Sequence, residues 1–331
     1  MGLGAAAAPL FPPVEPRRSG YLPVGDGHRL YFEECGPADG LPVVFLHGGP
    51  GSGCTPAQRR LFDPYRYRAI LVDQRGCGRS QPLGALAANT TAHLVADLET
   101  LRQALAIPAW IVFGGSWGST LALAYAQAHP ARVAGLVLRG IFLGSREEIA
   151  AYCRELGVPD SEAGGTDVAA WAYSILHGAA PAAERSARAW LDYERARMGE
   201  PPLAALPDAG QMAKARLQMH YLAQDCFLAS GKLLAGVEAL RGIPAALVQG
   251  LVDPVCPPAV ARRLHQIWPE AAWLPVAAGG HGGLSPPIAS ACMAALDAIA
   301  DHFPVRNGRG IPTGYPGRAA ALVAAGDAGP P

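Results

Sequence analysis

The sequence predicts an α/β fold built on a mostly parallel sheet that helices cover on both faces. Five short runs are almost wholly apolar, which is typical of strands that are buried on both sides. These runs are Val43–Leu46, Ala69–Val72, Trp110–Phe113, Val133–Leu138 and Ala246–Gln249. Helical patterns lie between them: Thr91–Leu105 carries leucines at helical spacing, and Trp117–His129 stops before a proline. Strands that alternate with helices indicate an α/β architecture.

The alternation stops between residues 145 and 241, where helical patterns continue without a clear strand. We interpret this stretch as a helical cap inserted into a core that residues 21–144 and 242–305 form together. Residues 1–20 are expected to be a flexible leader. Residues 306–331 are rich in Gly, Ala and Pro and poor in large apolar side chains, which predicts a disordered tail.

Charge and cysteine content narrow the class of protein. The 331 residues carry 27 basic and 27 acidic side chains, so the formal net charge is zero. Nucleic acids and acidic membranes attract basic surfaces, so neither is expected as a partner. No apolar run reaches eighteen residues, the N-terminus does not read as a secretory signal, and the seven cysteines lack metal-ligand spacing. We expect a cytoplasmic protein with reduced thiols.

The segment Gly114-Gly-Ser-Trp-Gly118 identifies a candidate nucleophile. It has the G-x-S-x-G pattern, and it follows a predicted strand and opens a predicted helix. In the α/β-hydrolase fold this sharp turn lifts the serine hydroxyl above the sheet edge, and the glycines allow the turn without a clash. We therefore predict an α/β-hydrolase fold with Ser116 as nucleophile. Haloalkane dehalogenase and epoxide hydrolase chemistry is excluded, since it needs a carboxylate at this position.

The glycine-rich segment His47-Gly-Gly-Pro-Gly51 directly follows the first core strand. In this fold that loop supplies one backbone N–H to the oxyanion hole, and the residue after the nucleophile supplies the other. We expect these donors to be Gly49 and Trp117. His47 is a weaker candidate for the general base, because a better one lies downstream.

A serine hydroxyl needs a general base, and the base needs a carboxylate to orient it. In this fold the two follow the nucleophile in the order acid, then histidine. Asp253 comes directly after the run Ala246–Gln249, at the end of a strand that shares the edge of the nucleophile. His281 lies in a loop between two pairs of glycines, which lets it reach inward. Ser116, Asp253 and His281 are therefore the predicted catalytic triad.

Several motifs in one order carry a resemblance to a known family. They are His47–Gly51, Asp73–Ser80 (DQRGCGRS), Gly114–Ser119, Leu138–Phe142 and Asp253–Cys256. Together they resemble the bacterial prolyl aminopeptidases, or proline iminopeptidases, over roughly residues 21–303. The resemblance implies release of an N-terminal proline from small peptides by an acyl-enzyme mechanism. It implies no metal and no organic cofactor.

The resemblance also implies a set of substrate-binding residues. Glu194 matches a cap glutamate that pairs with the imino group of proline, although its sequence neighbourhood is also that of a solvated helix face. Gln218 stands where the family carries a second glutamate, and an amide brings no charge to an amine. The pocket for the proline ring is implied to use Phe142, Tyr152 and Cys256, with Arg139 nearby. Phe142 and Tyr152 are equally typical of core residues.

Two other functions remain open at this point. The uncharged Gln218 motivates an esterase or amidase that acts on small non-peptide acyl compounds. A ligand-binding relative without turnover is the second alternative, which the presence of all three triad residues disfavours. The sequence predicts no particular oligomeric state.

Overall fold

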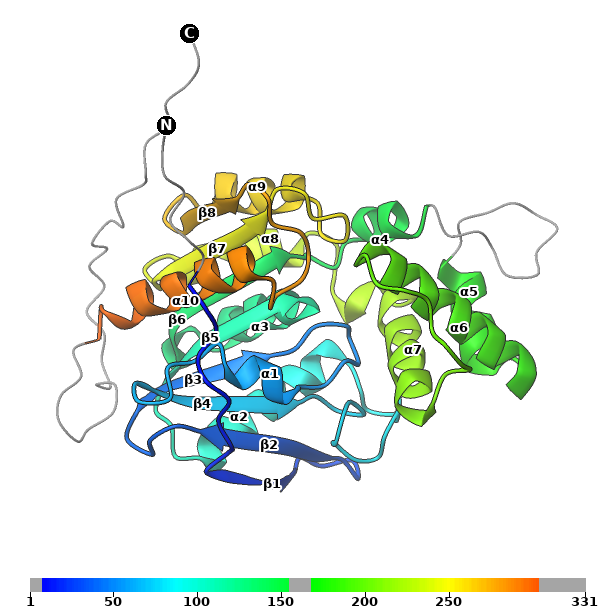
Figure 1. The fold of residues 1–331 in the computed structure, drawn as a ribbon, viewed down its shortest axis with the longest axis horizontal. Helices are drawn as coiled ribbons and strands as arrows, with labels where there is room; N and C mark the ends of the chain where they lie inside the picture. Colours follow the sequence, from blue (N-terminus) through cyan, green and yellow to red (C-terminus); the bar gives the residue numbers. More distant parts are fainter. Residues whose placement is uncertain (1–7, 155–167, 304–331) are drawn as a thin grey trace, which may run out of the picture.

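The structure, a computed structural model, describes residues 8–154 and 168–303. Its centre is an eight-stranded sheet with the strand order β1-β2-β4-β3-β5-β6-β7-β8 (Figure 1). The strands are β1 Arg18–Pro23, β2 Arg29–Cys35, β3 Leu41–Leu46, β4 Tyr67–Asp73, β5 Trp110–Ser116, β6 Val133–Ile141, β7 Ala245–Gly250 and β8 Ala272–Val276. The strands β1 and β2 are antiparallel to their neighbours, and all other pairs are parallel. The predicted α/β-hydrolase fold is confirmed in this sheet.

Helices cover both faces of the sheet. The helices are α1 Pro56–Arg59, α2 Thr91–Ala104, α3 Trp117–Ala128, α4 Arg146–Cys153, α5 Val168–His177, α6 Ala180–Arg197, α7 Ala209–Leu222, α8 Lys232–Ala235, α9 Pro258–Ile267 and α10 Pro286–Ala300. One apolar cluster joins the sheet to α2, α3, α8 and α9, and it runs on into the helices between β6 and β7. A second cluster joins the opposite face to α10. The five predicted core strands are therefore buried on both sides, as their unbroken apolar runs indicated.

Strand β2 was not predicted from the sequence, because charged residues interrupt its apolar pattern. Glu33 and Glu34 lie in the middle of β2 and are almost fully buried. Arg59 donates to both carboxylate oxygens of Glu33 at 2.9 Å, and Arg68 donates to Glu34 at 2.7 Å. Buried carboxylates are tolerated when such partners compensate their charge. The partners come from α1 and β4, so the sequence around β2 does not reveal them.

The stretch predicted as a cap holds α4 to α8, and its described residues include no strand. Helices α5, α6 and α7 pack on one another and lie together beside the sheet (Figure 1). Since the stretch is inserted after β6, it begins at the carboxyl edge of the parallel strands. Ligand sites of open parallel sheets lie at that edge.

The structure describes residues 8–20 of the expected flexible leader. The backbone N–H of Phe11 donates to the carbonyl oxygen of Arg60 at 3.0 Å, and Nε of Arg60 donates to the carbonyl oxygen of Phe11 at 2.7 Å. Strand β1 begins at Arg18. The predicted tail, residues 306–331, lies outside the described residues.

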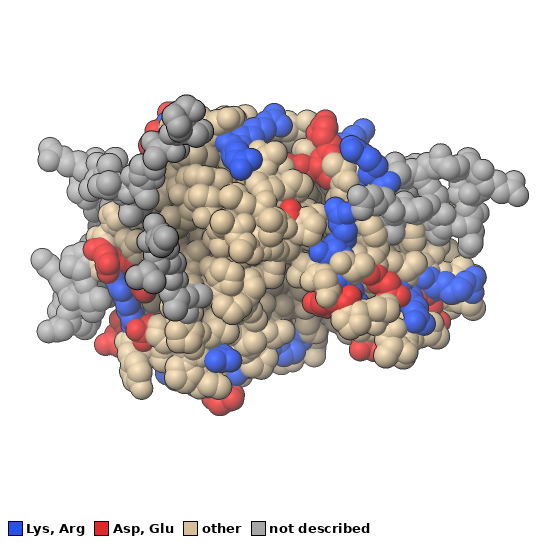
Figure 2. Space-filling view, turned by 45° about the horizontal axis from the view of Figure 1, so that its top comes forward, with Lys and Arg blue, Asp and Glu red and all other residues tan. Residues whose placement is uncertain are grey.

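Helices long and apolar enough to cross a bilayer do not occur in the described ranges. On the face in Figure 2, acidic and basic side chains of the described residues are interspersed, as a net charge of zero would suggest.

Candidate active site

The turn from β5 to α3 presents Ser116 in a strained backbone conformation, with φ 57° and ψ −127°. Non-glycine residues rarely adopt this region, and such strain is common at functional turns. Close backbone approach explains the flanking glycines. A Cβ on Gly114 would lie 2.1 Å from the carbonyl oxygen of Gly118, and a Cβ on Gly118 would lie 2.1 Å from that of Leu46. The G-x-S-x-G pattern is therefore a packing requirement of this turn.

Three predicted side chains from three loops meet at this turn. The Nε2 atom of His281 lies 3.1 Å from Oγ of Ser116, and its Nδ1 atom lies 2.8 Å from Oδ2 of Asp253. The other oxygen of Asp253 accepts the backbone N–H groups of Val255 and Cys256, both at 2.8 Å. These bonds fix the carboxylate, which in turn fixes the imidazole. The arrangement is that of a nucleophile, a base and an orienting acid.

Burial and local charges tune the two titrating partners of Ser116. Burial lowers the pKa of His281 below its usual value of 6.5, and Arg139 lowers it further, whereas Asp253 acts in the opposite direction. Burial alone would raise the pKa of Asp253, but the contact with His281 and the two backbone donors outweigh it and lower the pKa. At neutral pH the site therefore holds an unprotonated imidazole beside a carboxylate, which is the state that a general base requires.

The two predicted oxyanion donors lie on either side of the nucleophile. Trp117 is the first residue of α3, and the N–H groups of a helix's first turn have no partner within the helix. The segment after β3 approaches Ser116 at Gly48, where an added Cβ would lie 3.3 Å from Cβ of Ser116. Gly49 follows with a φ of 116°. The loop thus reaches the nucleophile, and Gly49 stays a predicted donor.

His47 is held in a structural role. It is buried, its Nδ1 atom lies 2.9 Å from the carbonyl oxygen of Gly48, and its Nε2 atom accepts the backbone N–H of Gln74 at 3.1 Å. The side chain of Gln74 donates to the carbonyl oxygen of His47 at 2.9 Å and accepts from Nε1 of Trp117 at 2.8 Å. Gln74 therefore ties the two sides of the predicted oxyanion hole together. The sequence analysis did not identify Gln74 as a residue of the site.

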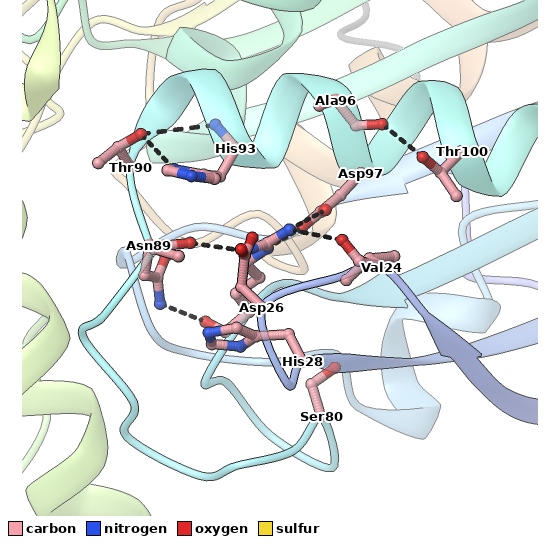
Figure 3. A network of polar contacts seen from close by, with 12 residues as sticks. Val24, Asp26, His28, Ser80, Asn89, Thr90, His93, Ala96, Asp97 and Thr100 are labelled. Atoms are coloured by element: carbon pink, nitrogen blue, oxygen red, sulfur yellow. Dashed lines mark hydrogen bonds and ion pairs between the residues drawn. The ribbon is translucent and has the colours of Figure 1, made fainter.

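The remainder of the segment Asp73–Ser80 is anchored by ion pairs, of which that between Arg75 and Asp97 is buried on both sides. Arg75 donates to both oxygens of Asp97, at 2.6 and 2.8 Å, and to Asp26 at 3.1 Å. Figure 3 shows Asp26, Asp97 and Val24 gathered around this contact. Asp73 accepts the side chain of Arg79 at 2.8 Å. The segment supports the loop that carries Gln74.

The predicted amine-binding residues adjoin each other on α6 and α7. Gln218 donates from Nε2 to Oε1 of Glu194 at 2.5 Å, and it accepts from Nε1 of Trp190 at 2.9 Å. The second oxygen of Glu194 lies 3.0 Å from the Nζ atom of Lys214, a residue that the sequence analysis did not single out. The negative charge of Glu194 also acts on His281 and raises its pKa slightly against the effect of burial.

Of the residues implied for the proline pocket, Cys256 lies beside Ser116, Tyr152 and Phe142 pack among apolar side chains, and Arg139 contacts the loop of His281. Cys256 lies 4.0 Å from Ser116, from Sγ to Oγ. The ring of Tyr152 packs edge-on against Trp190 at 6.0 Å between centroids, which places it in the same aromatic cluster as the cap helices. Phe142 is partly buried against the main core cluster. Arg139 instead lies behind the base, where it donates to the carbonyl oxygen of His281 at 2.7 Å.

Within the described ranges, no three His, Cys, Asp or Glu side chains converge as a metal site would require. The hydroxyl of Ser116 contacts the imidazole of His281, which contacts the carboxylate of Asp253, and this is the set of groups that acyl transfer uses.

Comparison with known proteins identifies the class of protein. The family model of the α/β-hydrolase fold matches residues 42–285. A carboxylesterase of Nitrososphaera gargenis shares the fold, with a TM-score of 0.61 at 16% identity, over 86% of this chain and 100% of that one. The proline iminopeptidase-related protein of Thermus thermophilus has a TM-score of 0.55 at 22% identity, over 86% and 97%. The chain belongs to the α/β-hydrolase fold family.

Sequence relatives identify the particular family. The chain is 44% identical to the proline iminopeptidase of Arabidopsis thaliana, over 88% of this chain and 82% of that protein. It is 41% identical to the proline iminopeptidase of Neisseria gonorrhoeae, over 86% and 97% respectively. The probable proline iminopeptidase of Streptomyces coelicolor is 43% identical, over 82% and 92%. Within the α/β-hydrolase fold, the chain belongs to the proline iminopeptidase family.

Proposed function

We propose that this chain is a serine aminopeptidase that releases an N-terminal proline from small peptides. The observation that carries the proposal is the contact of Ser116, His281 and Asp253. A cap carboxylate, Glu194, which contacts Gln218 and Lys214, is available for the amino end. The names of the sequence relatives support proline as the residue released. The seven cysteines are free, which supports a reducing compartment such as the cytoplasm.

The proposed reaction has two halves. The Ser116 hydroxyl attacks the carbonyl carbon of the first residue while Nε2 of His281 takes its proton. The carbonyl oxygen becomes negative against the N–H groups of Trp117 and the loop at Gly49, each of which can contribute about 3–4 kcal/mol to transition-state stabilisation. The shortened peptide leaves with the proton from His281, and an acyl-enzyme remains. Water, deprotonated by the same histidine, then releases proline and restores Ser116.

Recognition of the amino end is proposed to fall to the cap. Glu194 accepts the charged imino group, since a cation entering a partly dry site needs a compensating charge. Tyr152, Phe142 and Cys256 are proposed to border the pyrrolidine ring. Arg139 is proposed to act through the loop of His281 rather than on the ring, because its guanidinium donates to the carbonyl oxygen of that histidine.

The test compares purified protein on the β-naphthylamides of proline, alanine and leucine. We expect a higher kcat/KM for proline, and the absence of such a preference would contradict the proposed specificity. Replacing the nucleophile, Ser116→Ala, is expected to lower turnover by about 10⁴-fold or more while the fold is retained. Turnover that survives this change would contradict the assignment of the nucleophile.

One observation favours a second candidate function, hydrolysis of small esters or amides. The amine-binding site carries Gln218 instead of a second carboxylate, and Lys214 neutralises Glu194. An uncharged acyl substrate would not need that site. A kcat/KM for p-nitrophenyl acetate far above that for any prolyl substrate would favour this alternative.

A further inference from the structure

Lys214 lies at the carboxylate that is proposed to bind the substrate's amino group. Its Nζ atom is 3.0 Å from Oε2 of Glu194, while Gln218 occupies the other oxygen at 2.5 Å. Oε2 is buried and accepts no hydrogen bond from the described residues, so the lysine supplies charge to it without a well-oriented donor. This oxygen therefore retains the capacity to accept a hydrogen bond from an incoming ammonium group.

Helix α7 packs directly on the loop that leads to the oxyanion hole. A Cβ on Gly51 would lie 3.1 Å from Cα of Lys214 and 3.2 Å from its carbonyl oxygen. The backbone of Lys214 therefore lies against the segment that follows the predicted oxyanion donor Gly49, on the helix that also carries Gln218.

The charges of Glu194, Lys214 and Gln218 sum to zero. Glu194 carries one negative charge, Lys214 carries one positive charge, and Gln218 is neutral. A protonated amine that binds to Glu194 must share the carboxylate with a second ammonium group, and two like charges repel each other. Because the side chain of Lys214 is 31% exposed, it can swing towards water when the amine binds, at the cost of its ion pair.

We propose that Lys214 is a specificity-determining residue that competes with the substrate's amino group for Glu194. It weakens the binding of charged amino ends and leaves uncharged acyl substrates unaffected. The inference rests on the proposed function, since it takes Glu194 to be the amine's partner. It assigns Lys214 no part in the chemical step.

Lys214 and Lys232 are the only lysines in the sequence, so the second can serve as the control for the first. The variant Lys214→Met keeps the apolar stem and removes the charge, and Lys232→Met, at an exposed position on α8, is the matched control. For proline β-naphthylamide we expect Lys214→Met to lower KM about three- to tenfold, as the loss of one partly screened charge pair would allow. We expect kcat, the kinetics on p-nitrophenyl acetate and the control variant to stay at wild-type values. Lys214→Arg should restore the wild-type KM.

A rise in KM, or an unchanged KM, in folded Lys214→Met would overturn the proposal, because a lysine that merely positions Glu194 predicts weaker binding on removal. Lys214→Gln provides a second neutral variant should the methionine variant unfold. Inhibition of p-nitrophenyl acetate hydrolysis by prolinamide separates this inference from the proposed function. The inhibition constant should fall in Lys214→Met for prolinamide and stay constant for uncharged N-acetylprolinamide, whether or not prolyl substrates are turned over. Equal inhibition constants in wild type and variant would also overturn the proposal.

Discussion

Replacing Gln218 by glutamate is expected to make the stability of the cap depend on pH. Gln218 is 1% exposed, accepts from Trp190 at 2.9 Å and donates to Glu194 at 2.5 Å. A protonated carboxyl at this position can make both bonds. An ionised carboxyl keeps the first bond and turns the second into a contact between two negative charges. Folding therefore favours the protonated form and raises the pKa of the introduced carboxyl.

The magnitude follows from the bond that is lost. A hydrogen bond to a charged group contributes about 2 kcal/mol, and one pKa unit corresponds to about 1.4 kcal/mol. The pKa of the introduced carboxyl is thus expected to rise by about 1.5 units above its unfolded value of about 4.3. Because the folded pKa is the higher one, the native-like stability is present at low pH and is lost as pH rises through about 6. Between pH 5 and pH 8 the variant should lose about 1 kcal/mol relative to wild type.

Urea unfolding followed by far-UV circular dichroism measures this loss at pH 5 and pH 8. The matched control is Gln218→Met, which removes both hydrogen bonds and adds no titrating group. It should lose the same amount of unfolding free energy at both pH values, relative to wild type. If Gln218→Glu loses equal amounts at the two pH values, the deduced contact between the two carboxyls is wrong.

Three further predictions concern the reacting end of the site. Since burial lowers the pKa of His281, the acid limb of kcat/KM for p-nitrophenyl acetate should have its midpoint below pH 6.5, and a higher midpoint contradicts the proposed base. Gln74→Ala frees the loop at His47 from Trp117, so kcat should fall about tenfold or more with little change in KM; an unchanged kcat contradicts its positioning role. Gly114→Ala brings a Cβ within 2.1 Å of a carbonyl oxygen and should cost more than about 3 kcal/mol of unfolding free energy, whereas Gly280→Ala, with open space, should not.

The sheet was predictable from sequence where burial alone decides the pattern. The runs at β3, β4, β5, β6 and β7 are apolar because both of their faces are covered, and no other element is needed to explain them. Strand β2 was not predictable, since Glu33 and Glu34 are stable there only through arginines of other elements. The information that makes β2 a strand is thus tertiary.

The same distinction holds for the site. Ser116 ends β5, and Asp253 and His281 follow β7 and β8, so the fold class brings the three predicted side chains to one edge of the sheet. The contact between Lys214 and Glu194 depends on which faces of α6 and α7 meet, and a sequence gives the face of each helix without its partner. The sequence analysis did not identify Gln74, because its side chain bonds to Trp117, which lies 43 residues further along the chain.

The contacts between cap and core lead us to expect that the cap influences which bond is cleaved. Helix α6 bears Glu194 and, one turn later, Arg197, which donates to the carbonyl oxygen of Pro254 at 2.8 Å. That proline adjoins Asp253 of the triad. Helix α7 rests on Gly51 of the oxyanion loop. The helix that carries the proposed amine-binding carboxylate therefore contacts the loop of Asp253, and its neighbour α7 contacts the loop of the predicted oxyanion hole. We expect these contacts, rather than the predicted triad, to set the separation between the amine and the scissile carbonyl.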